Sequence, residues 1–90
     1  MGNFEVLLMP AALKFYKACP EGITKRLNKC FEDLENNPFW GPNIKVLKGE
    51  KRRYRYRLGD YRVIYSIDKE NNKVIVTLIA PRPSAYRNIN

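Results

Sequence analysis

The stretch from Lys51 to Ile67, KRRYRYRLGDYRVIYSI, constrains the fold more than any other part of the chain. Apolar and polar side chains alternate on both sides of Gly59-Asp60, which is the pattern of two β-strands joined by a tight turn. In the first strand one face carries Tyr54, Tyr56 and Leu58, and the other carries Arg53, Arg55 and Arg57. In the second strand Tyr61, Val63, Tyr65 and Ile67 share a face, and Arg62, Ile64 and Ser66 share the opposite one.

This hairpin is therefore expected to have two unlike faces. One face can join an apolar core. The other gathers guanidinium groups, which cannot be buried without partners and which suit contact with an anion. The same alternation also fits a plain solvent-exposed face of an amphipathic strand, and the residues alone leave both interpretations open.

The N-terminal half predicts a strand followed by two helices. Residues 4–9, FEVLLM, are predicted to form a short strand. A helix is predicted over 11–18, and Pro10 suits its first turn. After a break at residues 19–22, a second helix is expected from about Ile23 to Asn36. Its apolar stripe consists of Ile23, Leu27, Cys30, Phe31 and Leu34. This spacing places one helix face against a core, so we expect the two helices to form an antiparallel hairpin.

Beyond the helices, residues 39–50 read as an irregular crossover, and Lys73–Ala80 is a strongly β-prone strand. Phe39 and Trp40 in the crossover are either core residues or a platform on which bases stack. The predicted order is β-α-α-β-β-β in a single domain spanning residues 1–90. We expect an α+β fold: an antiparallel three- to four-stranded sheet with an N-terminal helical hairpin packed on one face.

Charge and composition limit the partners, cofactors and locations that we expect for this protein. Residues 1–43 are neutral overall, whereas residues 44–90 carry twelve basic and four acidic groups, so the whole net charge of +8 lies there. Such asymmetry suggests a nucleic-acid or acidic-protein partner. With no histidine, Cys19 and Cys30 cannot complete a zinc site without carboxylates, so we expect no metal and no cofactor. No apolar run reaches membrane-spanning length and no signal peptide is evident, which predicts a cytoplasmic protein without membrane contact.

The segments LKGEKRRYRYRLGDYRVIYSI and PRPSAYRN resemble the RelE/ParE superfamily of toxins from toxin–antitoxin systems, within it the RelE branch. The resemblance covers essentially the whole chain, with RLGDYRVIY as its most specific part. It implies a ribosome-dependent endoribonuclease that cuts mRNA in the ribosomal A site, and an antitoxin that wraps and silences it. The expected partners are therefore a cognate antitoxin, the ribosome and mRNA.

The resemblance also implies site residues. The catalytic set falls on Arg55, Arg57, Arg62, Arg82 and Tyr86. Further cations are expected to hold RNA or the ribosome, namely Lys45, Lys48, Lys51, Arg52, Arg53 and Arg87. Some members of the family have lysine where Arg55 and Arg57 stand, and an arginine stays charged and cannot act as a general base. Tyr86 is then the candidate for proton transfer, or alternatively a ring that stacks on a base.

Two other functions fit the same residues. ParE-type relatives share the fold and poison DNA gyrase through another surface. A non-catalytic module that only grips phosphates would use the same basic face. Formation of a cleavage product distinguishes a nuclease from both.

Overall fold

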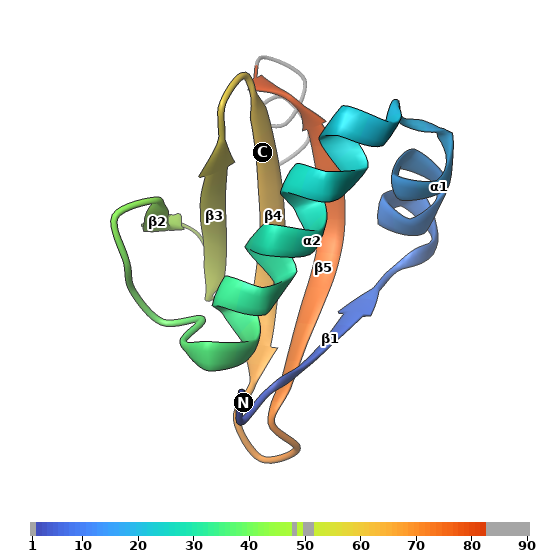
Figure 1. The fold of residues 1–90 in the computed structure, drawn as a ribbon. Coiled ribbons are helices and arrows are strands. Elements are labelled where there is room, and N and C mark those ends of the chain that lie inside the picture. Colours follow the sequence, from blue (N-terminus) through green and yellow to red (C-terminus); the bar gives the residue numbers. More distant parts are fainter. Residues whose placement is uncertain (1, 48, 50–51, 83–90) are drawn as a thin grey trace.

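The computed structural model describes residues 2–47, 49 and 52–82, which form two helices and a five-stranded sheet (Figure 1). In chain order the elements are β1 (Glu5–Leu8), α1 (Pro10–Ala18), α2 (Glu21–Asn36), β2 (Ile44–Leu47), β3 (Arg53–Leu58), β4 (Tyr61–Asp68) and β5 (Lys73–Pro81). The strands lie in the order β1-β5-β4-β3-β2. The α+β class and the N-terminal helical pair are confirmed.

The sheet differs from the expected one in strand number and direction. The crossover contains a strand, β2, which pairs antiparallel with β3 and forms one edge of the sheet. This strand is only four residues long and is flanked by Gly and Pro. Its alternation of apolar and polar side chains is too short to predict a strand from the sequence. At the other edge β1 pairs parallel with β5, so the sheet is mixed. The chain can reach this arrangement because α1 and α2 carry it across the sheet, from one edge to the other (Figure 1).

Local sequence explains where the helices begin and end. Pro10 occupies the first position of α1, where its missing N–H has no helical partner to lose. Glu21 opens α2 and places an acidic side chain in its first turn, where it offsets the helix dipole. Asn37 terminates α2 by donating its backbone N–H to the carbonyl of Asp33, and Pro38 follows. No helix in the part of the chain that the structure describes is long and apolar enough to cross a membrane.

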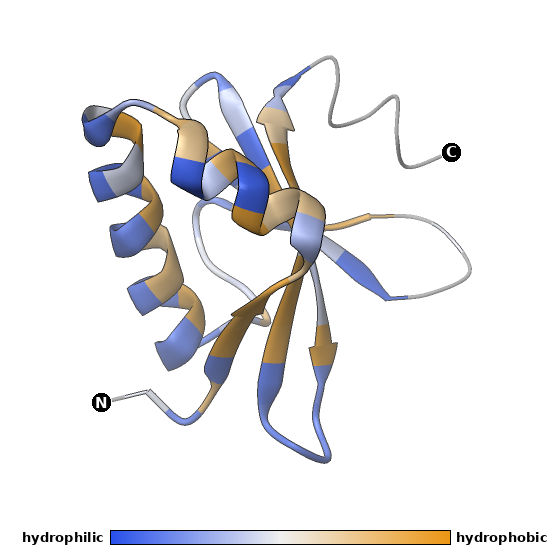
Figure 2. Cartoon of the chain, turned by 90° about the vertical axis from the view of Figure 1, so that its right-hand side faces the viewer, coloured by the Kyte–Doolittle hydropathy of each residue, from blue (hydrophilic) through white to orange (hydrophobic). Residues whose placement is uncertain are grey.

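The core lies between the helices and one face of the sheet. The predicted stripe of α2 supplies Leu27, Cys30 and Leu34, all fully buried. Opposite them, the sheet contributes buried side chains from three strands: Tyr54, Tyr56, Leu58, Val63, Tyr65, Val74, Val76 and Ile79. The core face predicted for the central hairpin is thus confirmed, and Figure 2 shows the apolar side of α2 turned toward the sheet.

Two of the three core tyrosines donate their hydroxyl hydrogens to acceptors outside the sheet, and the third stacks on one of them. The rings of Tyr54 and Tyr65 stack at 5.4 Å between centroids, and the Tyr65 hydroxyl donates to the Pro38 carbonyl at 2.7 Å. The Tyr56 hydroxyl donates to Oδ2 of Asp33 on α2 at 2.6 Å. These bonds tie α2 and the segment after it to the sheet, and a buried hydroxyl without such a partner would cost free energy.

Candidate functional site

The sheet face turned away from the helices, called here the open face, carries the cations predicted from the alternation. In β3 it bears Arg53, Arg55 and Arg57, and β3 pairs with β4 so that Arg57 lies directly opposite Arg62. The edge strand adds Lys45, whose register partner is Arg55. Because directly opposed residues in antiparallel strands share a face, these five cations lie on one surface.

The open face is not entirely polar. Ile64 and Ala80 are buried there, with the partly buried Leu47 and Leu78 packed against them. This small apolar cluster lies beside the arginines. The sequence did not indicate that these side chains form a cluster, because they come from different strands.

At one end of the open face, the β3–β4 turn organises two further arginine groups. Gly59 takes up φ +59°, a left-handed conformation in which a residue with a side chain is strained. Nη1 of Arg62 donates to the Gly59 carbonyl at 2.7 Å and to the Tyr61 carbonyl at 2.8 Å. The intervening Asp60 carbonyl accepts the backbone N–H of Arg82 at 3.0 Å.

Three consecutive turn carbonyls are therefore bonded to two predicted site residues, which fixes Arg62 and Arg82 with respect to each other. Arg62 is only 5% exposed, unlike the freely exposed residue suggested by strand alternation. Arg57 and Arg82 are exposed. We call the group of Arg57, Arg62 and Arg82 the turn-end cluster. Arg57 and Arg62 are register partners and the backbone of Arg82 is bonded to the turn between their strands, so three positive charges lie at this end of the sheet, which favours binding of an anion.

Arg55 lies further along β3 and is partly buried. Its Nε is buried and has no hydrogen-bond partner among residues 2–47, 49 and 52–82. A buried donor without a partner is uncommon in folded proteins, and at functional sites it often awaits a ligand. An anion resting on the open face would supply that acceptor.

Arg26 of α2 also reaches this end of the molecule. The guanidinium of Arg26 packs so closely against Gly59 that a Cβ at that position would collide with it. Sequence alone gives no signal for this contact, because it depends on how α2 crosses the sheet.

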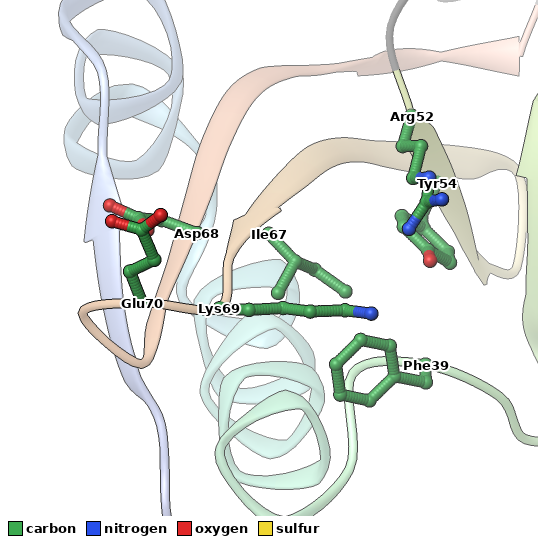
Figure 3. A pocket seen from close by; sticks show the side chains of 7 residues that line it. All are labelled: Phe39, Arg52, Tyr54, Ile67, Asp68, Lys69 and Glu70. Carbon is green, nitrogen blue, oxygen red and sulfur yellow. The ribbon is translucent and has the colours of Figure 1, made fainter.

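The other predicted residues are placed differently. Arg52 is exposed and lines a pocket of about 280 Å³ with Phe39, Tyr54 and Lys69, at the end of β3 far from the turn (Figure 3). It therefore lies away from the turn-end cluster. The predicted residues Lys48, Lys51, Tyr86 and Arg87 lie outside the described residues.

The two aromatic residues of the crossover have different environments. Phe39 is partly buried, makes an edge contact with Phe4 at 5.7 Å and lies under the Lys69 ammonium group. It belongs to the core. Trp40 is 74% exposed, so it is available for contact with a partner.

Comparison with known proteins places this geometry in context. The model of the ParE toxin of type II toxin–antitoxin systems matches residues 6–83. A putative toxin RelE1 of Methanocaldococcus jannaschii is 33% identical over 88 residues, covering 96% of this chain and 98% of the relative.

Solved structures of RelE toxins resemble this chain as well. The archaeal RelE–RelB complex of Pyrococcus horikoshii includes a chain with 28% identity and a TM-score of 0.74, and the match covers 88% of this chain and 94% of that one. The isolated RelE toxin of E. coli has 20% identity and a TM-score of 0.76, with 97% and 99% covered, which shows a shared fold.

Proposed function

The chain belongs to the ParE/RelE family of toxins of type II toxin–antitoxin systems, and on that premise we propose that it is a ribosome-dependent endoribonuclease that cleaves mRNA in the A site. The observation that carries the proposal is the turn-end cluster. Three arginines lie at one turn, with Arg55 and its unpartnered Nε on the same face. Clustered guanidinium groups match the charge and geometry of a phosphodiester.

The chemistry that fits such a site is attack by the ribose 2′-oxygen on the adjacent phosphate. A new P–O bond forms to the 2′-oxygen, and the bond to the 5′-oxygen of the next nucleotide breaks. The products are a 2′,3′-cyclic phosphate and a free 5′-hydroxyl, so no metal or cofactor is consumed. Negative charge accumulates on the phosphorane, and preorganised guanidinium groups stabilise that charge more than they stabilise the ground state.

The arginines have different roles in this proposal. Arg57 and Arg82 are exposed and are assigned to the phosphate oxygens. Nη1 of Arg62 donates to two turn carbonyls, so Arg62 stabilises the turn. Its positive charge contributes to the electrostatic potential at the site without direct contact with the phosphate. None of them can accept a proton at working pH. Removal of the 2′-hydroxyl proton is assigned to Tyr86, or to the ribosome if Tyr86 instead stacks on a base. The departing 5′-oxygen takes up a proton from the same group or from water, which gives the free 5′-hydroxyl.

The wider basic surface is proposed to hold RNA. Lys45 and Arg53 flank the site on the open face and are suited to the phosphates on either side of the cleaved bond. Lys48, Lys51, Arg52 and Arg87 are proposed to bind RNA or the ribosome as well. A protein that acts on translating ribosomes works in the cytoplasm.

An antitoxin is the proposed protein partner, since solved relatives are RelE–RelB complexes. We expect an acidic segment of it to cover Arg55 and Arg57, because charge complementarity speeds association and fixes the register of the contact. In the complex, modification of Arg57 by phenylglyoxal should be suppressed while Arg52, at the other end of β3, stays reactive. Equal reactivity of Arg57 in the free and bound toxin would show that the antitoxin binds elsewhere.

The experiment that tests the activity is mapping of new 5′ ends on a defined mRNA, with and without programmed ribosomes. The proposal predicts cleavage within the A-site codon only when ribosomes are present. Cleavage of free mRNA would retain the nuclease but remove the ribosome from its mechanism.

Inhibition of DNA gyrase is the second candidate, favoured by the match to the ParE toxin model. A supercoiling assay with purified gyrase separates the two functions. Inhibition of supercoiling without any new mRNA ends would replace the ribonuclease proposal. Binding to RNA with neither effect would leave a module that only grips phosphates.

A further inference from the structure

A second pocket, of about 300 Å³, lies between the end of α2 and the segment that leads into β2. Asp33 and Tyr56 line it from α2 and β3, and Trp40 lines it from the crossover. We call it the Asp33–Trp40 pocket. It lies at the edge of the sheet, on the face that the helices cover, and it shares no lining residue with the turn-end cluster. The ribonuclease proposal does not use it.

The charge of this pocket is opposite to that of the open face. Among the described residues that line it, Asp33 alone is ionised at neutral pH, and the others are polar amides, aromatic or apolar groups. The pocket also lies at the C-terminal end of α2, where backbone carbonyls concentrate partial negative charge. No basic residue stands in the last turn of α2 to offset it. A cation is therefore attracted here and a phosphate is repelled.

The Asp33 carboxylate is held in place and still has room to accept hydrogen bonds. Its Oδ2 accepts from the buried Tyr56 hydroxyl at 2.6 Å, which fixes the direction of the carboxylate. Its Oδ1 lies 3.5 Å from Nζ of Lys29, whose side chain is 72% exposed. Such a long, exposed pair is weak. Because a carboxylate can accept about four hydrogen bonds, capacity remains on both oxygens.

Trp40 supplies the complementary surface. A tryptophan that is 74% exposed is unusual enough to need an explanation, because the indole presents a large apolar area to water. The face of an indole ring attracts cations, and a planar guanidinium stacks on it better than an ammonium group does. The amide side chains of Asn36 and Asn43 line the same pocket and add hydrogen-bonding groups.

We propose that the Asp33–Trp40 pocket binds an arginine side chain of a protein partner, with the guanidinium stacked on Trp40 and donating to the Asp33 carboxylate. The volume suits one extended side chain, and the Asp33 carboxylate favours a cationic group over a phosphate as the occupant. The inference goes beyond the ribonuclease activity and is independent of it, since binding here requires neither ribosome nor mRNA.

The test uses the fluorescence of Trp40, which is the single tryptophan of the chain and therefore reports on this pocket alone. The full-length protein is titrated with N-acetyl-arginine amide at constant ionic strength. The matched control is N-acetyl-citrulline amide, which has nearly the same shape without the charge. We expect a saturable change with the arginine compound, and binding of the citrulline compound that is weaker by about tenfold or more. Equal responses to both compounds would overturn the proposal.

Two substitutions sharpen the result. Asp33→Asn keeps an oxygen that can accept from Tyr56 but removes the charge, so it should weaken arginine binding by about tenfold. Glu32→Gln removes a neighbouring exposed charge on α2 that does not line the pocket, and it should leave binding within about twofold of the wild type. Comparable losses in the two variants would mean a diffuse attraction to α2 rather than a site.

Lysine provides the last comparison. N-acetyl-lysine amide carries the same charge without a planar group, so it should bind several-fold more weakly than the arginine compound. Lysine binding as tight as arginine binding would contradict the stacked guanidinium. Lys29→Gln removes a cation that pairs only weakly with Asp33, so arginine binding should tighten slightly or stay within about twofold of the wild type, and a clear loss of affinity would contradict the assigned role of Asp33.

Discussion

Replacing Arg62 by alanine tests whether this residue holds the β3–β4 turn. Its Nη1 donates to the Gly59 and Tyr61 carbonyls, and the side chain is 5% exposed. A hydrogen bond from a charged donor contributes about 1.5–3 kcal/mol to stability. The turn is at the surface, where water can partly replace the lost donor, so the lower end applies to each bond. Arg62→Ala should therefore lower the free energy of unfolding by about 3 kcal/mol.

Arg57→Ala is the matched control, because Arg57 lies directly opposite Arg62 in the register and is exposed. Its removal should change the free energy of unfolding by no more than about 0.5 kcal/mol. Equilibrium urea unfolding followed by far-UV circular dichroism measures both values. If Arg62→Ala is as stable as the wild type, or if Arg57→Ala loses as much, then Arg62 does not hold the turn as the geometry indicates.

Three further experiments test the core, the two cysteines and the proposed role of Tyr86. Leu27→Asp places a charge at a fully buried position of α2 and should cost at least about 4 kcal/mol, abolishing the cooperative thermal transition that the exposed control Lys25→Asp retains. Burial raises the pKa of the Cys30 thiol, so iodoacetamide at neutral pH should modify only Cys19 in the native protein and both cysteines in denaturant, as seen by mass spectrometry. Tyr86→Phe should slow A-site cleavage about 10²-fold if the hydroxyl transfers a proton, and a near-normal rate would leave the ring as a stacking surface.

Much of the fold was predictable because the periodic signals were strong. The alternation on both sides of Gly59-Asp60 placed three tyrosines in the core, and the stripe through Leu27 placed one face of α2 against them. β2 was not predicted, because four residues are too few to show a clear alternation of apolar and polar side chains. Its extended conformation is stabilised by its pairing with β3. The parallel pairing of β1 with β5 joins segments about 70 residues apart, and the local sequence pattern cannot predict a contact over that separation.

The candidate site was predictable only in part. Strand alternation correctly placed Arg55, Arg57 and Arg62 on one face. It could not show that Arg62 is buried against turn carbonyls, that Arg26 reaches Gly59, or that Trp40 is exposed beside Asp33. Each of these depends on tertiary contacts between segments that are distant in sequence.

The central claim is that the turn-end cluster stabilises the cleavage of a phosphodiester, and the single-turnover rate of Arg82→Ala on programmed ribosomes tests it most directly. The substitution removes the side chain but keeps the backbone N–H that donates to the Asp60 carbonyl, so the turn retains its geometry. Its rate should be lower by about 10²–10³, equivalent to about 2.7–4 kcal/mol, while the rate of Lys14→Ala, at an exposed position of α1, should stay within about twofold of the wild type. Cleavage by Arg82→Ala at the wild-type rate would contradict the account.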